Sequence, residues 1–99
     1  MKIQRDEILK KLEDQKETLR HLGVRKLGLF GSWARGEASS DSDLDFLVEF
    51  EKKTFDSYME LKFFLEDLFH RPVDLVIPET LKERLKDSIL KENIRVPGL

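Results

Sequence analysis

Apolar residues recur among charged ones at helical spacing in three segments of the chain. Over 5–22, isoleucine and leucine residues three or four positions apart predict an amphipathic helix, which Gly23 would end. A second helix is predicted over 56–69, with Asp56 as its N-cap and with one apolar stripe. That stripe consists of Tyr58, Leu61, Phe64, Leu65 and Leu68. A third helix is predicted over 80–90, and its inward-facing residues are Leu81, Leu85, Ile89 and Leu90.

Three other segments, 24–30, 44–50 and 73–77, have the short apolar patterns that predict strands. The segment 44–50 is apolar nearly throughout, which is typical of a strand buried inside a sheet. Between the first two strands, 31–42 is rich in glycine and serine. It therefore predicts a turn, with a short helical piece at 33–35.

The order helix, strand, strand, helix, strand, helix predicts an α/β (α+β) fold. We expect a short mixed sheet of three or more strands with helices packed on one side. The chain has 99 residues, which fits a single domain spanning 1–99. The tail from 91 to 99 is not assigned to any element.

Composition narrows the class of protein. Apolar residues make up 39% of the chain, charged residues 38%, and the net charge is -2. An acidic balance argues against direct nucleic-acid binding, which needs a basic surface. The chain has no cysteine, so it can form neither a disulfide nor a thiolate metal site. It also has no long apolar run, so we expect no membrane span and a cytoplasmic location.

Candidate chemistry lies in three aspartates. Asp43 and Asp45 are two positions apart at the start of the second predicted strand, so both point to the same face, about 7 Å apart. Asp74 lies between apolar neighbours in the third strand, where an isolated buried carboxylate would be costly. If that strand pairs beside the second, the three carboxylates share one face. They could then hold two Mg²⁺ ions about 4 Å apart.

Such a site suggests metal-assisted nucleotide transfer. Gly31 allows the backbone to approach a phosphate closely, and Ser32 offers an amide and a hydroxyl donor. Asp43 and Asp45 would hold the metal that carries the triphosphate. Asp74 would complete the second metal site and help to deprotonate the attacking hydroxyl. Attack on the α-phosphate would then release pyrophosphate.

Other interpretations of this segment are weaker. The run from Asp41 to Asp45 resembles the start of an EF-hand loop, but Phe46 and Lys52 occupy the positions that require glycine and an acid. The spacing of Gly31 and Gly36 resembles a P-loop that lacks its lysine. A polar turn with solvated aspartates remains the simplest alternative.

One long motif resembles the signature of the DNA polymerase beta nucleotidyltransferase superfamily. It consists of Phe30-Gly31-Ser32, ten further residues, and Asp43-Leu44-Asp45-Phe46. The fuller strings Gly-Ser-Trp-Ala-Arg-Gly and Ser-Asp-Leu-Asp resemble the minimal nucleotidyltransferase branch of that superfamily. The segment 71–76 is similar to the strand of that branch that bears the third carboxylate. The resemblance covers about 24–85.

This resemblance implies a small nucleotidyltransferase fold and a specific activity. Members of the branch are antitoxin partners of HEPN-domain ribonuclease toxins, and they resemble enzymes that move AMP from ATP onto a toxin tyrosine. By this resemblance, Gly31 and Ser32 contact the triphosphate, and Asp43, Asp45 and Asp74 are the metal ligands. Arg35 matches an arginine of the motif and is a candidate contact to the nucleotide. No chemistry is assigned to Trp33.

Two other functions stay open at this point. The chain could neutralise a toxin by binding alone, or it could transfer a nucleotide to a small molecule. The intact set of carboxylates favours an enzyme over a pure binding protein. The short chain leaves little room for an acceptor pocket of its own, so the acceptor is expected on another chain. Association with the toxin or with a second copy is compatible with the sequence.

Overall fold

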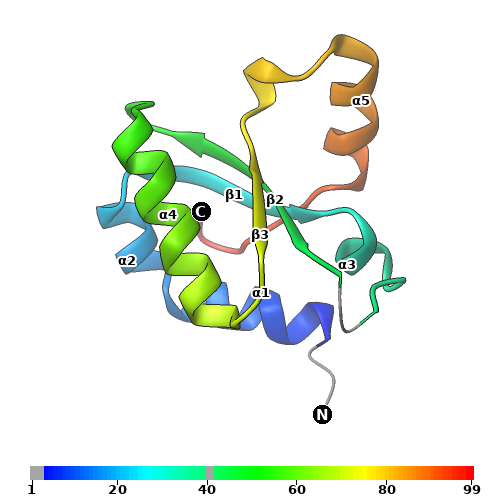
Figure 1. The fold of residues 1–99 in the computed structure, drawn as a ribbon, viewed down its shortest axis with the longest axis horizontal. Helices are drawn as coiled ribbons and strands as arrows, with labels where there is room; N and C mark the ends of the chain where they lie inside the picture. Colours follow the sequence, from blue (N-terminus) through cyan, green and yellow to red (C-terminus); the bar gives the residue numbers. More distant parts are fainter. Residues whose placement is uncertain (1–3, 40–41) are drawn as a thin grey trace.

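A four-stranded mixed sheet organises the molecule (Figure 1). The computed structural model describes residues 4–39 and 42–99. Strands β1 (Val24–Phe30) and β2 (Leu44–Phe50) pair antiparallel, and β3 (Val73–Val76) lies parallel to β2. The predicted α/β class, with helices on one side of a mixed sheet, is confirmed.

A fourth strand comes from the tail that the sequence left unassigned. This strand, β4 (Ile94–Arg95), pairs antiparallel with β1 and completes the order β3-β2-β1-β4. Val96 follows it and is almost fully buried, and its N–H donates to the carbonyl of Leu27 at 2.9 Å. The end of the chain therefore belongs to the sheet and to the core.

Three helices cover one face of the sheet. They are α1 (Arg5–Asp14), α2 (Lys16–His21) and α4 (Phe55–Phe69). The single helix predicted over 5–22 is divided at Gln15, although the predicted apolar positions stay inside. The helical side of the core consists of Ile8, Leu12, Leu19, Leu61, Leu65 and Phe69.

The N-cap of α4 differs from the prediction. Thr54 caps this helix, because its hydroxyl accepts a hydrogen bond from the Ser57 N–H at 3.0 Å. Asp56 lies instead in the first turn, where its charge is favourable beside the positive end of the helix dipole. The predicted end of this helix at Phe69 is confirmed.

Side chains along β2 point alternately to the core and to the opposite face of the sheet, where Leu47 is also buried. Leu44, Phe46 and Val48 are fully buried against the helices. Asp45 and Glu49 alternate with them and point to the other face, because successive side chains of a strand point to opposite sides. The helices α1, α2 and α4 all pack against the first face, and the candidate site lies on the second.

The predicted C-terminal helix is confirmed, but its bounds and its inward face differ from the prediction. Instead of one helix over 80–90, the chain forms a 3-10 turn η1 (Pro78–Thr80) and then α5 (Glu83–Glu92). None of the α5 residues is buried, and Leu85 and Leu90 are 50% and 45% exposed. Figure 1 shows α5 standing beyond the sheet, away from the helices that cover the core. No helix within 4–39 and 42–99 is long and apolar enough to cross a bilayer.

Candidate active site

The parallel pairing of β2 and β3 places two of the candidate carboxylates side by side. Asp45 and Asp74 are direct partners in the register, so their side chains lie on the same face of the sheet. Asp43 precedes Asp45 by two residues, just before β2 begins. The pairing on which the sequence prediction depended is confirmed, whereas the metal-binding role of the three aspartates stays a prediction.

Two hydrogen bonds hold β3 at this position. The Leu44 N–H donates to the Pro72 carbonyl at 3.1 Å, which joins the start of β2 to the start of β3. The Val73 N–H donates to the Glu66 carboxylate at 3.0 Å, which joins β3 to α4. Both bonds lie next to the aspartates, so the strand register and the spacing of the carboxylates are set together.

The carboxylate of Asp45 is destabilised in its charged form by its surroundings. Partial burial, followed by the negative charges of Asp74 and Asp43, raises the pKa of Asp45 from 3.8 to about 6. Glu92 raises this pKa further, and the positive charge of Arg35 lowers it. Carboxylates that repel one another in this way form a region of negative potential that attracts cations.

This raised pKa predicts a pH-dependent cost to folding. Asp45 binds its proton more tightly when folded, so its contribution to stability is present below about pH 4 and is lost as the pH rises through about 6. Without metal, Asp45→Asn should therefore be more stable than the unaltered protein at pH 7.5, by about 1 kcal/mol after allowance for solvent screening. The gain should shrink at pH 4.5. Urea unfolding at both pH values measures it, and an equal gain at both would contradict the prediction.

The donor chemistry fits a magnesium site, although no such site is preformed. Within the described residues, no group of three or more histidine, aspartate or glutamate side chains is already placed to hold a metal ion. Oxygen donors of the kind that Mg²⁺ prefers are nevertheless brought together by Asp45 and its partner Asp74. Their mutual repulsion is what a bound cation would relieve.

Gly31 lies next to these carboxylates, at the end of β1. Its backbone has φ 78° and ψ -156°, a conformation that is essentially restricted to glycine. A β-carbon at this position would overlap the carboxylate of Asp45. Ser32 then begins the short helix α3 (Ser32–Arg35). Contact of Gly31 and Ser32 with a triphosphate stays a prediction.

A residue that the sequence did not single out completes this corner of the site. One carboxylate oxygen of Glu92, at the end of α5, accepts from the Gly31 N–H at 2.8 Å and from the Arg35 Nη1 at 2.6 Å. The Arg35 Nε donates to Glu37 at 2.9 Å. The hydrogen bond that Arg35 donates to Glu37 and the charge of Glu92 raise the pKa of Arg35. Glu92 was missed because it lies 61 residues from Gly31 and belongs to no local motif.

Trp33 also has a structural role, which its position in the sequence did not reveal. It is 6% exposed, and its indole N–H donates to the Ser42 carbonyl at 3.2 Å. The guanidinium of Arg71 lies over its ring, 4.8 Å from the centroid. Trp33 thus joins the residues directly before Asp43 and β3, and so helps to position the carboxylates.

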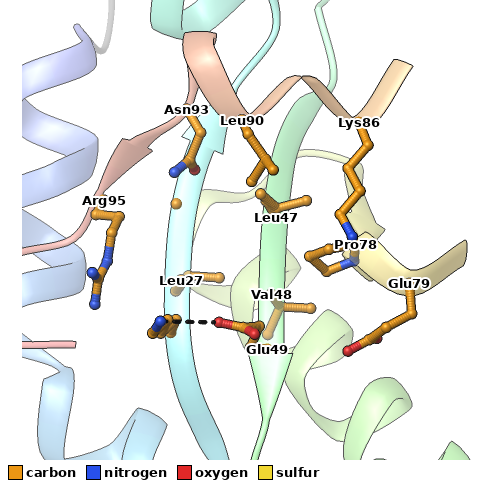
Figure 2. Close-up of a pocket in the computed structure, with 12 residues that line it drawn as sticks. Leu27, Leu47, Val48, Glu49, Pro78, Glu79, Lys86, Leu90, Asn93 and Arg95 are labelled. Atoms are coloured by element: carbon orange, nitrogen blue, oxygen red, sulfur yellow. Dashed lines mark ion pairs between the residues drawn. The ribbon is translucent and has the colours of Figure 1, made fainter. Parts of the chain in front are cut away.

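A pocket of about 270 Å³ continues along the same side of the sheet, between β1, β2 and α5 (Figure 2). Leu47, Pro78 and Leu90 supply apolar lining. Asn93 lies so close to Gly28 that a β-carbon there would overlap its side chain. The end of α5 therefore rests on the backbone of β1 at Gly28 and at Gly31.

Nearly the whole chain matches one known protein family. A model of the nucleotidyltransferase domain matches residues 6–96, which is nearly the whole chain. This chain belongs to the nucleotidyltransferase domain family. The match includes the strands, the glycine-serine turn and all the candidate carboxylates.

Relatives within the nucleotidyltransferase family are close in sequence and in fold. A protein adenylyltransferase, MntA, of Thermococcus cleftensis is 42% identical over 83 residues, which cover 83% of this chain and 84% of that protein. A solved structure of a proposed minimal nucleotidyltransferase is 40% identical, with a TM-score of 0.73, and the match covers 87% of this chain and 93% of the other.

A more distant structural match comes from a complex. It is the structure of a tri-AMPylated Shewanella oneidensis HEPN toxin with MNT antitoxin. The match has a TM-score of 0.63 and 20% identity, and it covers 92% of this chain and 73% of that chain. At this level of identity the likeness concerns the fold alone.

Proposed function

We propose that this nucleotidyltransferase moves AMP from ATP onto a tyrosine of a HEPN-domain ribonuclease toxin, and so acts as its antitoxin. The observation that carries the proposal is the side-by-side placement of Asp45 and Asp74 beside the glycine turn at Gly31. The name of the Thermococcus relative supports protein AMP transfer. The motif resemblance and the fold shared with the Shewanella complex support the class of partner.

Each candidate residue would have a distinct role in AMP transfer. Gly31, Ser32 and Arg35 would bind the triphosphate. Asp43, Asp45 and Asp74 would hold Mg²⁺, which when bound would neutralise negative charge on the phosphates. Asp74 would help to take the proton from the tyrosine hydroxyl. The tyrosine oxygen would form a bond to the α-phosphorus, the bond to the bridging oxygen would break, and pyrophosphate would leave.

An open site fits an acceptor supplied by another protein. Asp43 and Asp74 are exposed on the face of the sheet that the core helices leave free. A small-molecule acceptor would need a pocket directly at these carboxylates to exclude water. The pocket of Figure 2 lies instead beyond Leu47, and none of the three aspartates lines it.

Incubation with a candidate HEPN toxin, together with ATP and Mg²⁺, tests the proposal. We expect the toxin to gain the mass of one or more AMP groups on a tyrosine and to lose its ribonuclease activity. A toxin variant with that tyrosine changed to phenylalanine is the matched control, and it should gain no mass. Absence of any AMP addition to a well-folded toxin would refute the enzymatic proposal.

Neutralisation by binding alone is the second candidate, and it needs only a protein-contact surface such as the exposed aromatic residues of α4 provide. Phe55 and Phe63 on α4 are 77% and 60% exposed, so their rings are available for contact with another protein. These residues suit contact with a protein partner whether or not AMP is transferred. Protection of ribonuclease substrates without AMP on the toxin would favour this candidate.

A further inference from the structure

Glu92 already occupies the donors that the proposed function assigns to the nucleotide. A single oxygen, Oε1, receives both the Gly31 N–H and the Arg35 guanidinium, at 2.8 and 2.6 Å. A backbone N–H and a guanidinium that converge on one anionic oxygen would hold a phosphate oxygen equally well. The carboxylate of Glu92 therefore marks an anion site and fills it.

A carboxylate in this place competes with a phosphate for two reasons. The Gly31 backbone has one N–H, so it cannot make a full hydrogen bond to Glu92 and to a phosphate together. Glu92 also adds its negative charge to those of Asp43 and Asp74 beside Asp45, which repels an incoming polyphosphate. We propose that Glu92 is a built-in competitor of the nucleotide, and that the end of α5 must move away before the triphosphate binds.

The packing of α5 permits such a movement. None of its residues is buried, and the Glu92 side chain itself is 25% exposed. The helix rests on the sheet through its last turn, where Leu90 borders the pocket (Figure 2). Just after that turn, Asn93 lies against Gly28. The buried Oδ1 of Asn93 accepts no hydrogen bond from any described residue. Apart from the two hydrogen bonds of Glu92, this turn would lose no fully buried side-chain contact of α5 if it moved.

The inference rests on the proposed binding of triphosphate at Gly31 and Arg35, and Glu92→Gln tests it. Glutamine keeps the size and the hydrogen-bond acceptor but removes the charge. Calorimetric titration with Mg²⁺-tripolyphosphate, and in parallel with Mg²⁺ and AMP-PNP, should show binding about five-fold tighter than in the unaltered protein, the difference between a charged and a neutral hydrogen bond. Unchanged or weaker binding would overturn the inference.

Two matched variants separate competition from a general charge effect. Asp87→Asn removes the same charge from an exposed position of α5 and should change the affinity by less than about two-fold. Glu37→Gln removes the other carboxylate partner of Arg35 but leaves the Gly31 N–H engaged, so its gain should be smaller than that of Glu92→Gln. Equal gains in all three variants would mean that net charge alone sets the affinity, and the competitor role would be rejected.

A measurement on the unaltered protein provides a second readout. Saturating Mg²⁺-tripolyphosphate should speed the amide hydrogen exchange of α5, because Glu92 loses its two donors. Unchanged or slower exchange would contradict the inference even if Glu92→Gln fails to fold. Tripolyphosphate contains no AMP and needs no toxin. Failure of AMP transfer with these results intact would therefore remove the proposed function and leave the competitor role standing.

Discussion

Asp45→Asn is expected to lower AMP transfer to the toxin by about 10³-fold or more, because a catalytic metal is worth several kcal/mol of transition-state stabilisation. Asp45 is the central carboxylate of the site. It lies beside Asp74 in the strand register, and it would touch any side chain at position 31. Asparagine keeps the shape but removes the charge that would hold the cation. Initial rates with radiolabelled ATP, the toxin and Mg²⁺ measure the effect.

Loss of folding would not explain this result. The charge of Asp45 is repelled by its neighbours, so the asparagine variant should be at least as stable as the unaltered protein at neutral pH. Asp67→Asn, on the exposed side of α4, is the matched control and should keep full activity. Transfer within about ten-fold of normal by the folded Asp45→Asn protein would contradict the metal-binding role. Full protection from the toxin by this inactive variant would favour neutralisation by binding.

Gly31→Ala is expected to have the second largest effect, on both stability and transfer. The backbone at Gly31 is nearly forbidden to any residue with a β-carbon, and that carbon would overlap the carboxylate of Asp45. Strain of this kind costs about 3 kcal/mol, and the displaced Asp45 should lower transfer by about 10²-fold through misplacement alone. Chemical denaturation measures the first effect, and initial rates at a temperature where the variant stays folded measure the second.

Gly36→Ala is the matched control for this substitution. Gly36 also has a positive φ of 74°, but nothing lies within 4 Å of the β-carbon that alanine would add. Its cost should be about 1 kcal/mol, from backbone conformation alone, and transfer by the folded protein should be normal. Equal loss of activity in the two variants would show that the close approach of Gly31 to Asp45 is unimportant.

Local patterns were sufficient for most of the sheet. The predicted bounds of the first two strands agree with β1 and β2 residue for residue, because Gly23 and Gly31 flank the first strand and polar residues flank the second. The apolar positions of the first two helices were also placed correctly, except that Phe69, outside the predicted stripe, is buried. The division of the first predicted helix at Gln15 was not foreseen, since no glycine or proline marks it.

The C-terminal segment shows the limit of such patterns. An amphipathic repeat predicts that one face of a helix is apolar, but it does not determine what covers that face. Leu85 and Leu90 follow a helical repeat and yet remain half-exposed, because α5 stands beyond the sheet. The two-residue strand β4 is too short to show periodicity, and only its pairing with β1 defines it.

By itself, the sequence determined the glycine-serine turn, the two aspartates at Asp43 and Asp45, and the strand that bears Asp74, because these depend on spacing within short segments. Only the tertiary structure decided that Asp74 lies directly opposite Asp45 and that Glu92 holds Gly31 and Arg35. Those contacts join residues far apart in the chain, and their geometry follows from strand register and helix placement. No local pattern of residues encodes either one.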